Sequence, residues 1–515
     1  MASITTSCKI VSPLRSLFCL AILAIVFCVP AESQQEEAKS AAISVKIDWN
    51  KTEFAVKTNL SLQVVVNPPL RRDSPIHDRA WNALRELKAD YVRFVPWYPY
   101  PRLGVAELEP PTKEKTSWEF SLIDPLVEDF FQATDGRPVM LNFSTIPQWM
   151  FRTANPVKYP DDPNEASWSY EQGEELRDPS GKEVADYYSR VASWYARGGF
   201  TDELGAFHAS QHKRKIALWE VLNEPEYEHA FTPQDYTKLY DAVVAAVRKQ
   251  LPETQFVGMS LAEPSNSPAF FEYFLDARNH KPGTPLDWIS YHFYAVPTLD
   301  QTSAAHQFTF FDQADKFLTS VKFIEAIRKR LSPQTKTAIN EVGCILPQDI
   351  GQGPTITSAA MIPQAYWNLC GAMFAYLYVN LARQGIDVLS SSQLVGYPTQ
   401  FPTVSMLDWQ TGKANARYSV LQLLHEKFRL GDHCVTTEAK SSSVLAQAFV
   451  AADGKRKILL INKRDRSLRI MIPGSRKGSE SHVDIKTSNG ISVPVQLQSE
   501  ELELGPFSVA VLELR

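Results

Sequence analysis

The chain has 515 residues, of which 44% are hydrophobic and 22% charged, and its formal net charge is -5 at pH 7. This composition is typical of a folded globular protein, and the length suits one large domain with a smaller one beside it. Because the chain contains no block of basic residues, a nucleic-acid partner is not expected.

The N-terminal segment has the features of a secretory signal. Lys9 and Arg15 precede the apolar run LFCLAILAIVFCVP, which is too short to span a bilayer comfortably, and Ala31 and Ser33 supply the small residues of a cleavage site. We therefore predict removal of residues 1–33 and a secreted protein, periplasmic if its source is bacterial. An uncleaved anchor is the alternative, and no second stretch is long enough for a transmembrane helix, so stable membrane insertion is not expected.

Few covalent cross-links are expected beyond that segment. The three cysteines that follow it are odd in number and lack metal-ligand spacing, which leaves room for one disulfide but not for a disulfide scaffold: Cys344, Cys370 and Cys434. Asn50 and Asn59 begin N-glycosylation sequons that we predict to be exposed. The sequon at Asn142 lies within an apolar strand, so this residue is predicted to be buried and unmodified.

Strands and helices alternate along most of the chain. Residues 34–66 are predicted to form a linker and N-terminal strands, part of which joins a β-sandwich at the other end of the chain. From residue 61 onward the predicted strands are 61–66, 90–97, 137–149, 216–226, 254–260, 286–295, 336–343 and 386–396. The predicted helices are 78–88, 121–134, 183–199, 232–252, 268–278, 316–331, 360–385 and 415–428. The fourth helix opens with a capping Thr232 and a first-turn Pro233.

The alternation predicts an α/β fold with two domains. Apolar strands that are each followed by a helix indicate a parallel sheet covered by helices, and eight such units predict a (β/α)8 TIM barrel over 67–430. A doubly wound open sheet is the alternative, but no glycine-rich phosphate turn follows the first strand. Short alternating strands with an Asp453-Gly454 turn predict a small C-terminal β-sandwich over 431–515.

Two carboxylates stand where predicted strands end. Glu224 follows the fourth strand and Glu341 ends the seventh, and in a barrel of this kind the active site forms at the C-terminal ends of the strands. Strands four and seven lie on opposite sides of the mouth, so the two carboxyl groups are expected to face one another. A protonated and an ionised carboxyl group in that arrangement suit glycosidic cleavage. The alternative is that each Glu only ends a strand or pairs with an arginine.

The residues around Glu224 carry a family resemblance. The stretch WEVLNEPE resembles the acid/base motif of clan A glycoside hydrolases, whose acid/base and nucleophile lie on barrel strands four and seven. The most similar family is glycoside hydrolase family 39, which contains β-xylosidases and α-L-iduronidases. DYVRFVPW is similar to its second strand, RPVMLNFSTIPQW to its third, and the resemblance extends from about residue 70 to about residue 430.

The resemblance implies roles for the residues at the two strand ends. Glu224 matches the general acid/base, and Asn223 matches the residue that hydrogen-bonds the 2-hydroxyl of the sugar. Glu341 matches the nucleophile. A (β/α)8 barrel with this pair of residues implies a retaining hydrolase that needs no cofactor.

Three further residues match positions that support the nucleophile. Tyr294 and His292 match residues that orient it and line the sugar subsite. Arg93 matches an arginine that keeps the nucleophile ionised, since an opposite charge lowers its pKa. As alternatives, Arg93 is a plain structural ion pair and His292 a satisfied core histidine.

The chain also departs from the family pattern. Strand two carries Val95 where the family has histidine, strand seven carries Val342 where it has tryptophan, and the SSSQLVG of strand eight contains no aromatic residue. These changes concern the choice of sugar and not the pair that cleaves. Four aromatic residues are expected on the active-site face, where they stack on sugars or simply pack: Trp97, Tyr98, Tyr100 and Trp149.

These observations predict a secreted retaining glycoside hydrolase that acts in exo mode on a β-linked sugar, like a β-xylosidase. The alternatives are an endo-acting clan A β-glucanase and a carbohydrate-binding barrel without catalysis. A metal hydrolase is not expected, because no cluster of His and Asp residues has ligand spacing. The expected partner is a carbohydrate substrate, and the sequence does not indicate an oligomeric state.

Overall fold

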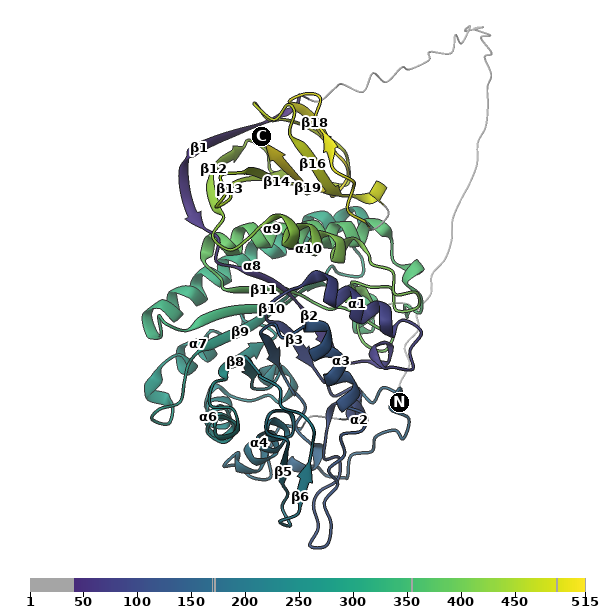
Figure 1. Cartoon of the computed structure of the whole chain (residues 1–515), viewed down its shortest axis with the longest axis vertical. Coiled ribbons are helices and arrows are strands. Elements are labelled where there is room, and N and C mark those ends of the chain that lie inside the picture. The colour runs from purple at the N-terminus through teal and green to yellow at the C-terminus, as the bar shows by residue number, and fades with distance from the viewer. Residues whose placement is uncertain (1–40, 169, 171–172, 353–354, 488–489, 515) are drawn as a thin grey trace, which may run out of the picture. The chain divides into compact units, whose positions relative to one another are not determined.

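A computed structural model describes residues 41–168, 170, 173–352, 355–487 and 490–514 (Figure 1). The predicted signal peptide and most of the predicted linker lie outside these residues. Within the described part of the chain, no helix combines the length and apolar character needed to cross a membrane.

Eight parallel strands close into a barrel, which confirms the predicted fold class. Around the barrel the strands follow their order in the chain, and the first strand pairs with the last. They are β2 (Asn59–Val65), β3 (Val92–Val95), β4 (Val139–Leu141), β7 (Leu218–Glu220), β8 (Gln255–Leu261), β9 (Trp288–Ala295), β10 (Lys336–Cys344) and β11 (Val388–Ser391). Side chains on both faces of these strands are buried, as expected for a parallel sheet covered by helices.

In the described chain, eight longer helices surround the barrel. They are α1 (His77–Leu87), α3 (Asp124–Thr134), α4 (Lys182–Arg197), α6 (Pro233–Gln250), α7 (Pro268–Phe274), α8 (Ser303–Leu331), α9 (Gln364–Gln384) and α10 (Ala416–Lys427). Two short helices, α2 (Pro101–Gly104) and α5 (Pro225–Glu228), lie in loops that follow β3 and β7. A small hairpin that the sequence did not indicate, β5 (Gly199–Thr201) with β6 (Phe207–Ala209), follows α4.

Local sequence explains where these helices begin and which face they bury. In α6 the Thr232 side chain accepts a hydrogen bond from the backbone N–H of Asp235, and Pro233 occupies the first turn, as predicted. Helix α8 begins 13 residues earlier than the predicted start at 316, because Phe310 and Ala314 already bury the same helical face. The predicted third strand ends early instead: β4 stops at Leu141.

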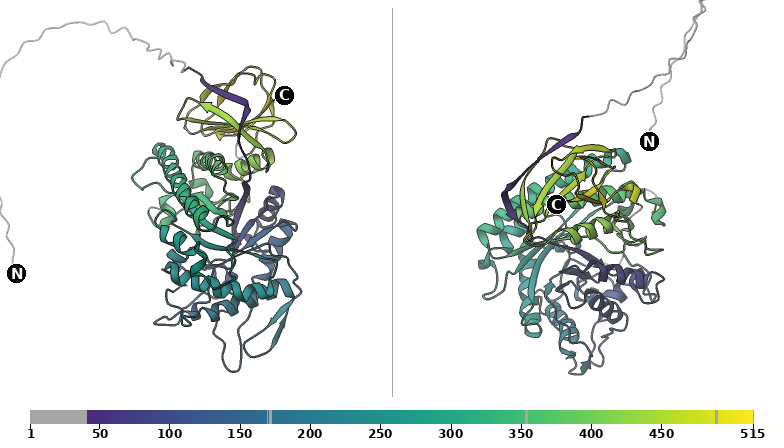
Figure 2. Two further views of the ribbon diagram at one scale, coloured as in Figure 1. Left: turned by 90° about the vertical axis from the view of Figure 1, so that its left-hand side faces the viewer. Right: turned by 45° about the horizontal axis from the view of Figure 1, so that its top comes forward.

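The β-domain joins both ends of the described chain. Its nine-stranded sheet has the order β17-β16-β19-β14-β13-β12-β1-β15-β18. Strand β1 (Ile43–Ala55) pairs antiparallel with β12 and parallel with β15, and thus connects two layers whose facing side chains form one apolar core, in which Val45, Ile458 and Ile470 are buried (Figure 2). The other strands are β12 (His433–Ala439), β13 (Val444–Val450), β14 (Arg456–Asn462), β15 (Leu468–Met471), β16 (Ser479–Val483), β17 (Val495–Gln496), β18 (Glu501–Leu504) and β19 (Val509–Leu514).

The β-domain and the barrel share a core. Phe449 and Val511 of the β-domain belong to the same buried apolar cluster as the barrel helices, and Lys427 of α10 donates to the carboxylate of Glu513 at 2.6 Å. This domain therefore lies against α9 and α10, of which α9 packs on β10 and α10 on β2.

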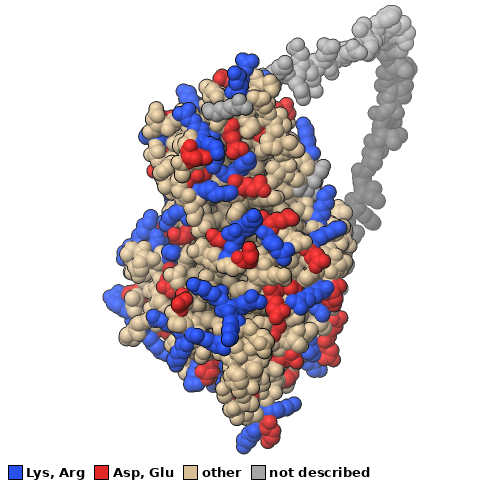
Figure 3. Space-filling model, viewed as in Figure 1, with Lys and Arg blue, Asp and Glu red and all other residues tan. Residues whose placement is uncertain are grey.

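All three cysteines of the described chain are buried and free, so none of them forms the disulfide that the sequence allowed. Asn142 is fully buried and donates to Glu220 and to the carbonyl of Leu222, whereas Asn50 is exposed and Asn59 half-buried. Charged side chains of both signs are interspersed over the face shown in Figure 3.

Candidate active site

A cavity of about 520 Å³ lies at the C-terminal ends of the barrel strands. Glu224 and Glu341 both line it, together with Asn223 and Tyr294. The structure thus brings together, in one cavity, residues that the sequence places on three different strand ends. The nearest oxygens of the two glutamates lie within 4.8 Å of each other.

Glu341, on β10, is surrounded by hydrogen-bond donors. Its Oε1 accepts from Arg93 Nη1 at 2.5 Å and from Gln63 Nε2 at 2.6 Å, and its Oε2 accepts from the Tyr294 hydroxyl at 2.7 Å. Burial by itself would raise the pKa of this carboxyl, but the positive charges of His292 and Arg93 outweigh burial and hold the pKa below its ordinary value. Glu341 is therefore a fixed, ionised carboxylate, as a nucleophile must be.

Arg93 lies beneath the cavity and is fully buried. Besides Glu341 it binds Glu220, at 2.5 Å from Nε, and its Nη2 donates to Asn223 Oδ1 at 2.7 Å and to Ser260 Oγ at 3.0 Å. Arg93 thus forms a structural ion pair with Glu220 and a second ion pair with Glu341. A buried charge requires an opposite charge nearby, and here two carboxylates supply it.

Glu224 lies on a turn between β7 and α5. Its backbone has a φ of 43°, in the left-handed region that non-glycine residues seldom adopt, and its N–H donates to the carbonyl of Ser260 at 3.0 Å. Among the described residues, one side-chain donor contacts its carboxyl group: His292 Nδ1, at 2.7 Å from Oε1. Leu222, two residues earlier, also lies in the left-handed region with a φ of 64°, so the turn that presents Glu224 contains two such non-glycine residues.

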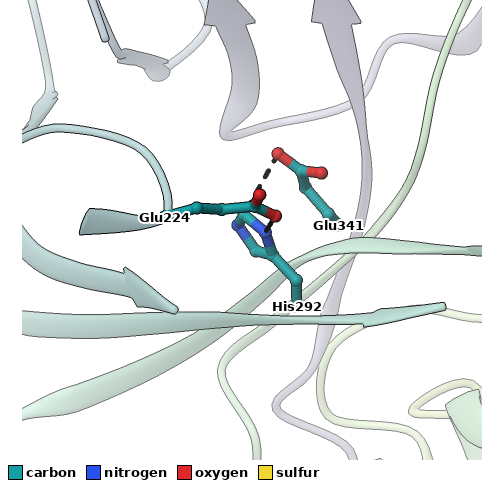
Figure 4. A group of neighbouring side chains, drawn as sticks. All are labelled: Glu224, His292 and Glu341. Atoms are coloured by element: carbon teal, nitrogen blue, oxygen red, sulfur yellow. Dashed lines mark hydrogen bonds and ion pairs between the residues drawn. The ribbon is translucent and has the colours of Figure 1, made fainter. Parts of the chain in front are cut away.

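His292 lies beside the Glu224 carboxyl group and within reach of Glu341 (Figure 4). Its Nδ1 faces Glu224, and its Nε2 lies 3.0 Å from Ser260 Oγ and 3.6 Å from Glu341 Oε1. Burial lowers the pKa of this imidazole, but Glu341 and Glu224 together raise it above its ordinary value. His292 is buried below the cavity and acts on the carboxylates, so it does not line the sugar subsite as the sequence suggested.

These three side chains also form the only group of His, Cys, Asp and Glu residues, within the described chain, whose atoms could hold a metal ion. The two carboxylates face opposite nitrogens of the imidazole ring. One nitrogen of that ring and one oxygen of each carboxyl group nevertheless lie within 4.8 Å of one another. The two carboxylates also raise the pKa of the imidazole, so its positive charge compensates theirs without an ion.

Aromatic rings form one wall of the cavity. Trp97 and Tyr98, both predicted, are joined there by Trp168 and Phe401, which were not predicted. The ring of Trp97 lies 5.0 Å from Tyr98, 5.4 Å from Trp168 and 6.0 Å from Phe401, measured between centroids. Such a surface can stack on the C–H faces of a sugar. Tyr100 is buried outside the lining, where its hydroxyl bonds to Thr399.

The prediction for Trp149 is wrong. This residue does not line the cavity: its indole Nε1 donates to the backbone carbonyl of Glu107 at 2.9 Å, and the guanidinium of Arg177 covers its ring at 4.5 Å. Trp149 lies eight positions after Leu141, the last residue of β4, so the strand does not fix where its ring lies. The contacts with Glu107 and Arg177 hold the ring outside the cavity instead.

Several residues that line the cavity were not predicted from the sequence. Gln63 of β2, Ser392 after β11 and Glu228 of α5 all line the cavity, and Ser392 Oγ donates to Gln63 Oε1 at 2.5 Å and lies 2.7 Å from the Tyr294 hydroxyl. A signal existed for Gln63, since it is a polar residue inside the apolar run SLQVVV. Ser260, which contacts both Arg93 and His292, is likewise a polar residue next to the end of an apolar strand.

Comparison with known proteins supports the fold. No family model and no curated protein matches the chain. Among solved structures, an α-L-arabinofuranosidase from Thermotoga maritima has a TM-score of 0.59 at 12% identity, covering 92% of this chain and 100% of that one. A glucosidase from Croceicoccus marinus has a TM-score of 0.58 at 14% identity, covering 92% and 99%. A GH30 endoxylanase from Clostridium papyrosolvens has a TM-score of 0.54 at 14% identity, covering 92% and 100%.

At these identities the likeness establishes the architecture, a TIM barrel with an attached β-domain, over almost the whole chain. It does not by itself establish chemistry.

Proposed function

We propose that this protein is a retaining O-glycoside hydrolase in which Glu341 is the nucleophile and Glu224 the general acid/base. The observation that carries the proposal is the pair of carboxyl groups from opposite sides of the barrel, with oxygens within 4.8 Å, in one cavity beside an aromatic wall. Retaining enzymes hold their carboxyl groups roughly 5 Å apart, whereas inverting enzymes leave space for a water molecule between them. The clan A architecture of the solved structures agrees with this assignment.

The reaction takes two displacements. In the first, Glu341 attacks the anomeric carbon, the glycosidic C–O bond breaks, and Glu224 gives its proton to the departing oxygen. In the second, the ionised Glu224 takes a proton from water, whose oxygen attacks the same carbon and releases Glu341 as a carboxylate. Two inversions restore the original configuration.

We further infer exo action on a β-linked sugar, in the manner of a β-xylosidase of glycoside hydrolase family 39. The family resemblance of the strand motifs supports the sugar class. The aromatic wall supports the exo mode: Trp168 Nε1 donates to the carbonyl of Thr399 at 3.0 Å, so the long loops after β4 and β11 meet beside the cavity. An endo-acting β-glucanase would need a cleft that stays open where these loops meet.

A panel of aryl glycosides tests the proposal: xyloside, galactoside, arabinoside, glucuronide and iduronide. We expect turnover of at least one, with the first-formed sugar observed by NMR in the configuration of the substrate. An inverted product would overturn the double displacement. Binding of sugars without turnover of any would instead favour a non-catalytic carbohydrate-binding barrel.

We also propose that the protein is secreted after cleavage near Ser33 and that Asn50, rather than the half-buried Asn59, carries glycan where the host glycosylates. Expression of the full chain tests both points. N-terminal sequencing should find a mature protein that begins near residue 34, and glycosidase treatment should reduce its mass unless Asn50 is replaced.

A further inference from the structure

A third carboxyl group lies next to the catalytic pair and has no part in the double displacement. Glu228 is the last residue of α5, one helical turn after Glu224, and its own N–H donates to the carbonyl of Glu224 at 2.7 Å. It lines the same cavity. The residue is half-buried and its Oε2 is fully buried, and burying a carboxyl oxygen without a partner is costly.

One oxygen of Glu228 holds two residues of the cavity. Its Oε1 accepts from the indole Nε1 of Trp97 at 2.7 Å and from Asn223 Nδ2 at 2.9 Å. Trp97 belongs to the loop after β3, and Asn223 to the turn after β7. The same atom thus joins the aromatic wall to the residue that precedes the acid/base.

Asn223 is held at both ends as a result. Its Oδ1 accepts from Arg93 Nη2 at 2.7 Å while its Nδ2 donates to Glu228. This pair of partners sets the orientation of the amide, so that a nitrogen and not an oxygen faces Glu228. One hydrogen of Nδ2 then remains for a sugar hydroxyl.

The surroundings of the other oxygen, Oε2, favour the neutral form of the Glu228 carboxyl group. Oε2 is buried and has no hydrogen-bond partner among the described residues. Burial raises the pKa of Glu228 well above its usual range, and the negative charges of Glu224 and Glu341 add to that rise, although the bonds from Asn223 and Trp97 oppose it. A neutral carboxylic acid accepts both hydrogen bonds without placing a third negative charge beside the catalytic pair.

We propose that Glu228 is a positioning residue. One of its oxygens, Oε1, holds the side chains of Asn223 and Trp97 in the orientation in which they bind the sugar. The inference rests on the proposed glycosidase function. It assigns Glu228 no contact with the reacting atoms, and it predicts that the bonds to Oε1 matter while the charge and the proton of Glu228 do not.

The test compares Glu228→Ala with Glu228→Gln, with Glu226→Ala as matched control. A glutamine side chain keeps an oxygen acceptor at this position, so we expect Glu228→Gln to retain KM and kcat within about threefold. Glu228→Ala removes both bonds and should raise KM about tenfold or more, and lower the affinity of a bound product sugar by a similar factor. Glu226 lies on the same short helix but outside the lining of the cavity, and its Oε1 accepts from the backbone N–H of Glu263 at 3.0 Å and not from Trp97 or Asn223. Its replacement should therefore change KM and the affinity for the product sugar by less than about threefold.

Trp97→Phe gives a second arm, because it removes the indole N–H while keeping an aromatic ring in the wall of the cavity. Combined with Glu228→Ala it should add less than its single effect, since the two replacements remove the same bond. Thermal unfolding of every variant identifies any that fails to fold.

Two results would overturn the proposal. If Glu228→Ala behaved like Glu226→Ala, Oε1 would position nothing. If Glu228→Gln lost as much activity as Glu228→Ala, the proton or charge of Glu228 would matter instead. Failure of the glycosidase proposal is distinct from both, because wild-type protein would then turn over no glycoside; the affinity comparison would still decide the role of Glu228, and absence of any sugar binding would refute both proposals.

Discussion

The two sides of the barrel mouth hold their carboxyl groups differently. On the β10 side, Glu341 accepts hydrogen bonds from Arg93, Gln63 and Tyr294, and 8% of its side chain is exposed. On the β7 side, Glu224 accepts from His292 and 17% of its side chain is exposed. A nucleophile must stay ionised and in place, whereas an acid/base gains and loses a proton in every cycle. Many fixed donors suit the first task and would obstruct the second.

The largest expected effect is on the β10 side. Glu341→Gln removes the nucleophile, so turnover should fall on the order of 10⁴-fold or more for every substrate, whatever its leaving group. Steady-state kinetics with several aryl glycosides, alongside thermal unfolding, measure this. A variant that still turned over activated substrates at a tenth of the wild-type rate would remove Glu341 from the chemistry.

The β7 side should respond in a way that depends on the leaving group. Glu224→Gln removes the proton donor, so poor leaving groups should lose about 10²–10⁴-fold, the typical contribution of general acid catalysis. A dinitrophenolate departs without protonation, so formation of the glycosyl-enzyme should survive with that substrate. The intermediate should then accumulate, and azide should restore turnover as a glycosyl azide. Equal losses on all substrates without an azide response would show that Glu224 is not the acid.

Arg93→Lys weakens the compensation of Glu341 without removing the positive charge. Because the pKa of Glu341 in the folded protein lies below its ordinary value of 4.5, its contribution to stability is complete above that value and is lost as the pH falls through the lowered pKa. The variant should raise this pKa, so the acid limb of kcat/KM should move to higher pH by about one unit. Measurement of kcat/KM between pH 3 and 8 tests this expectation. If the acid side of the profile did not shift, Arg93 would stabilise Glu220 without affecting the pKa of Glu341.

The smallest effect separates two tryptophans that the sequence treats alike. Trp97→Ala removes part of the aromatic wall and should raise KM about tenfold, as expected for the loss of a ring that stacks on the sugar. Trp149→Ala should leave KM within about twofold, since Trp149 lies outside the cavity, and should act on thermal stability instead. Equal effects on KM would contradict the boundaries of the cavity described above.

Local sequence patterns were enough to predict the barrel and the two strand ends that carry Glu224 and Glu341. Apolar runs alternate with amphipathic helices, and a polar residue at the tip of a buried strand is visible without knowledge of its neighbours. The cap of α6 at Thr232 is local in the same sense.

The surroundings of those carboxyl groups depend instead on contacts between distant parts of the chain. The bond from Gln63 to Glu341 joins residues 278 positions apart, and Arg93 reaches Glu220 and Glu341 across 127 and 248 positions. Trp168 and Phe401 come from irregular loops, which have no periodic pattern to read. Trp149 was misplaced because it lies eight positions beyond the end of β4 at Leu141, where contacts with Glu107 and Arg177, and not the strand, decide its position. A hydrogen-bond partner is chosen by distance in space, and a single sequence records distance only along the chain.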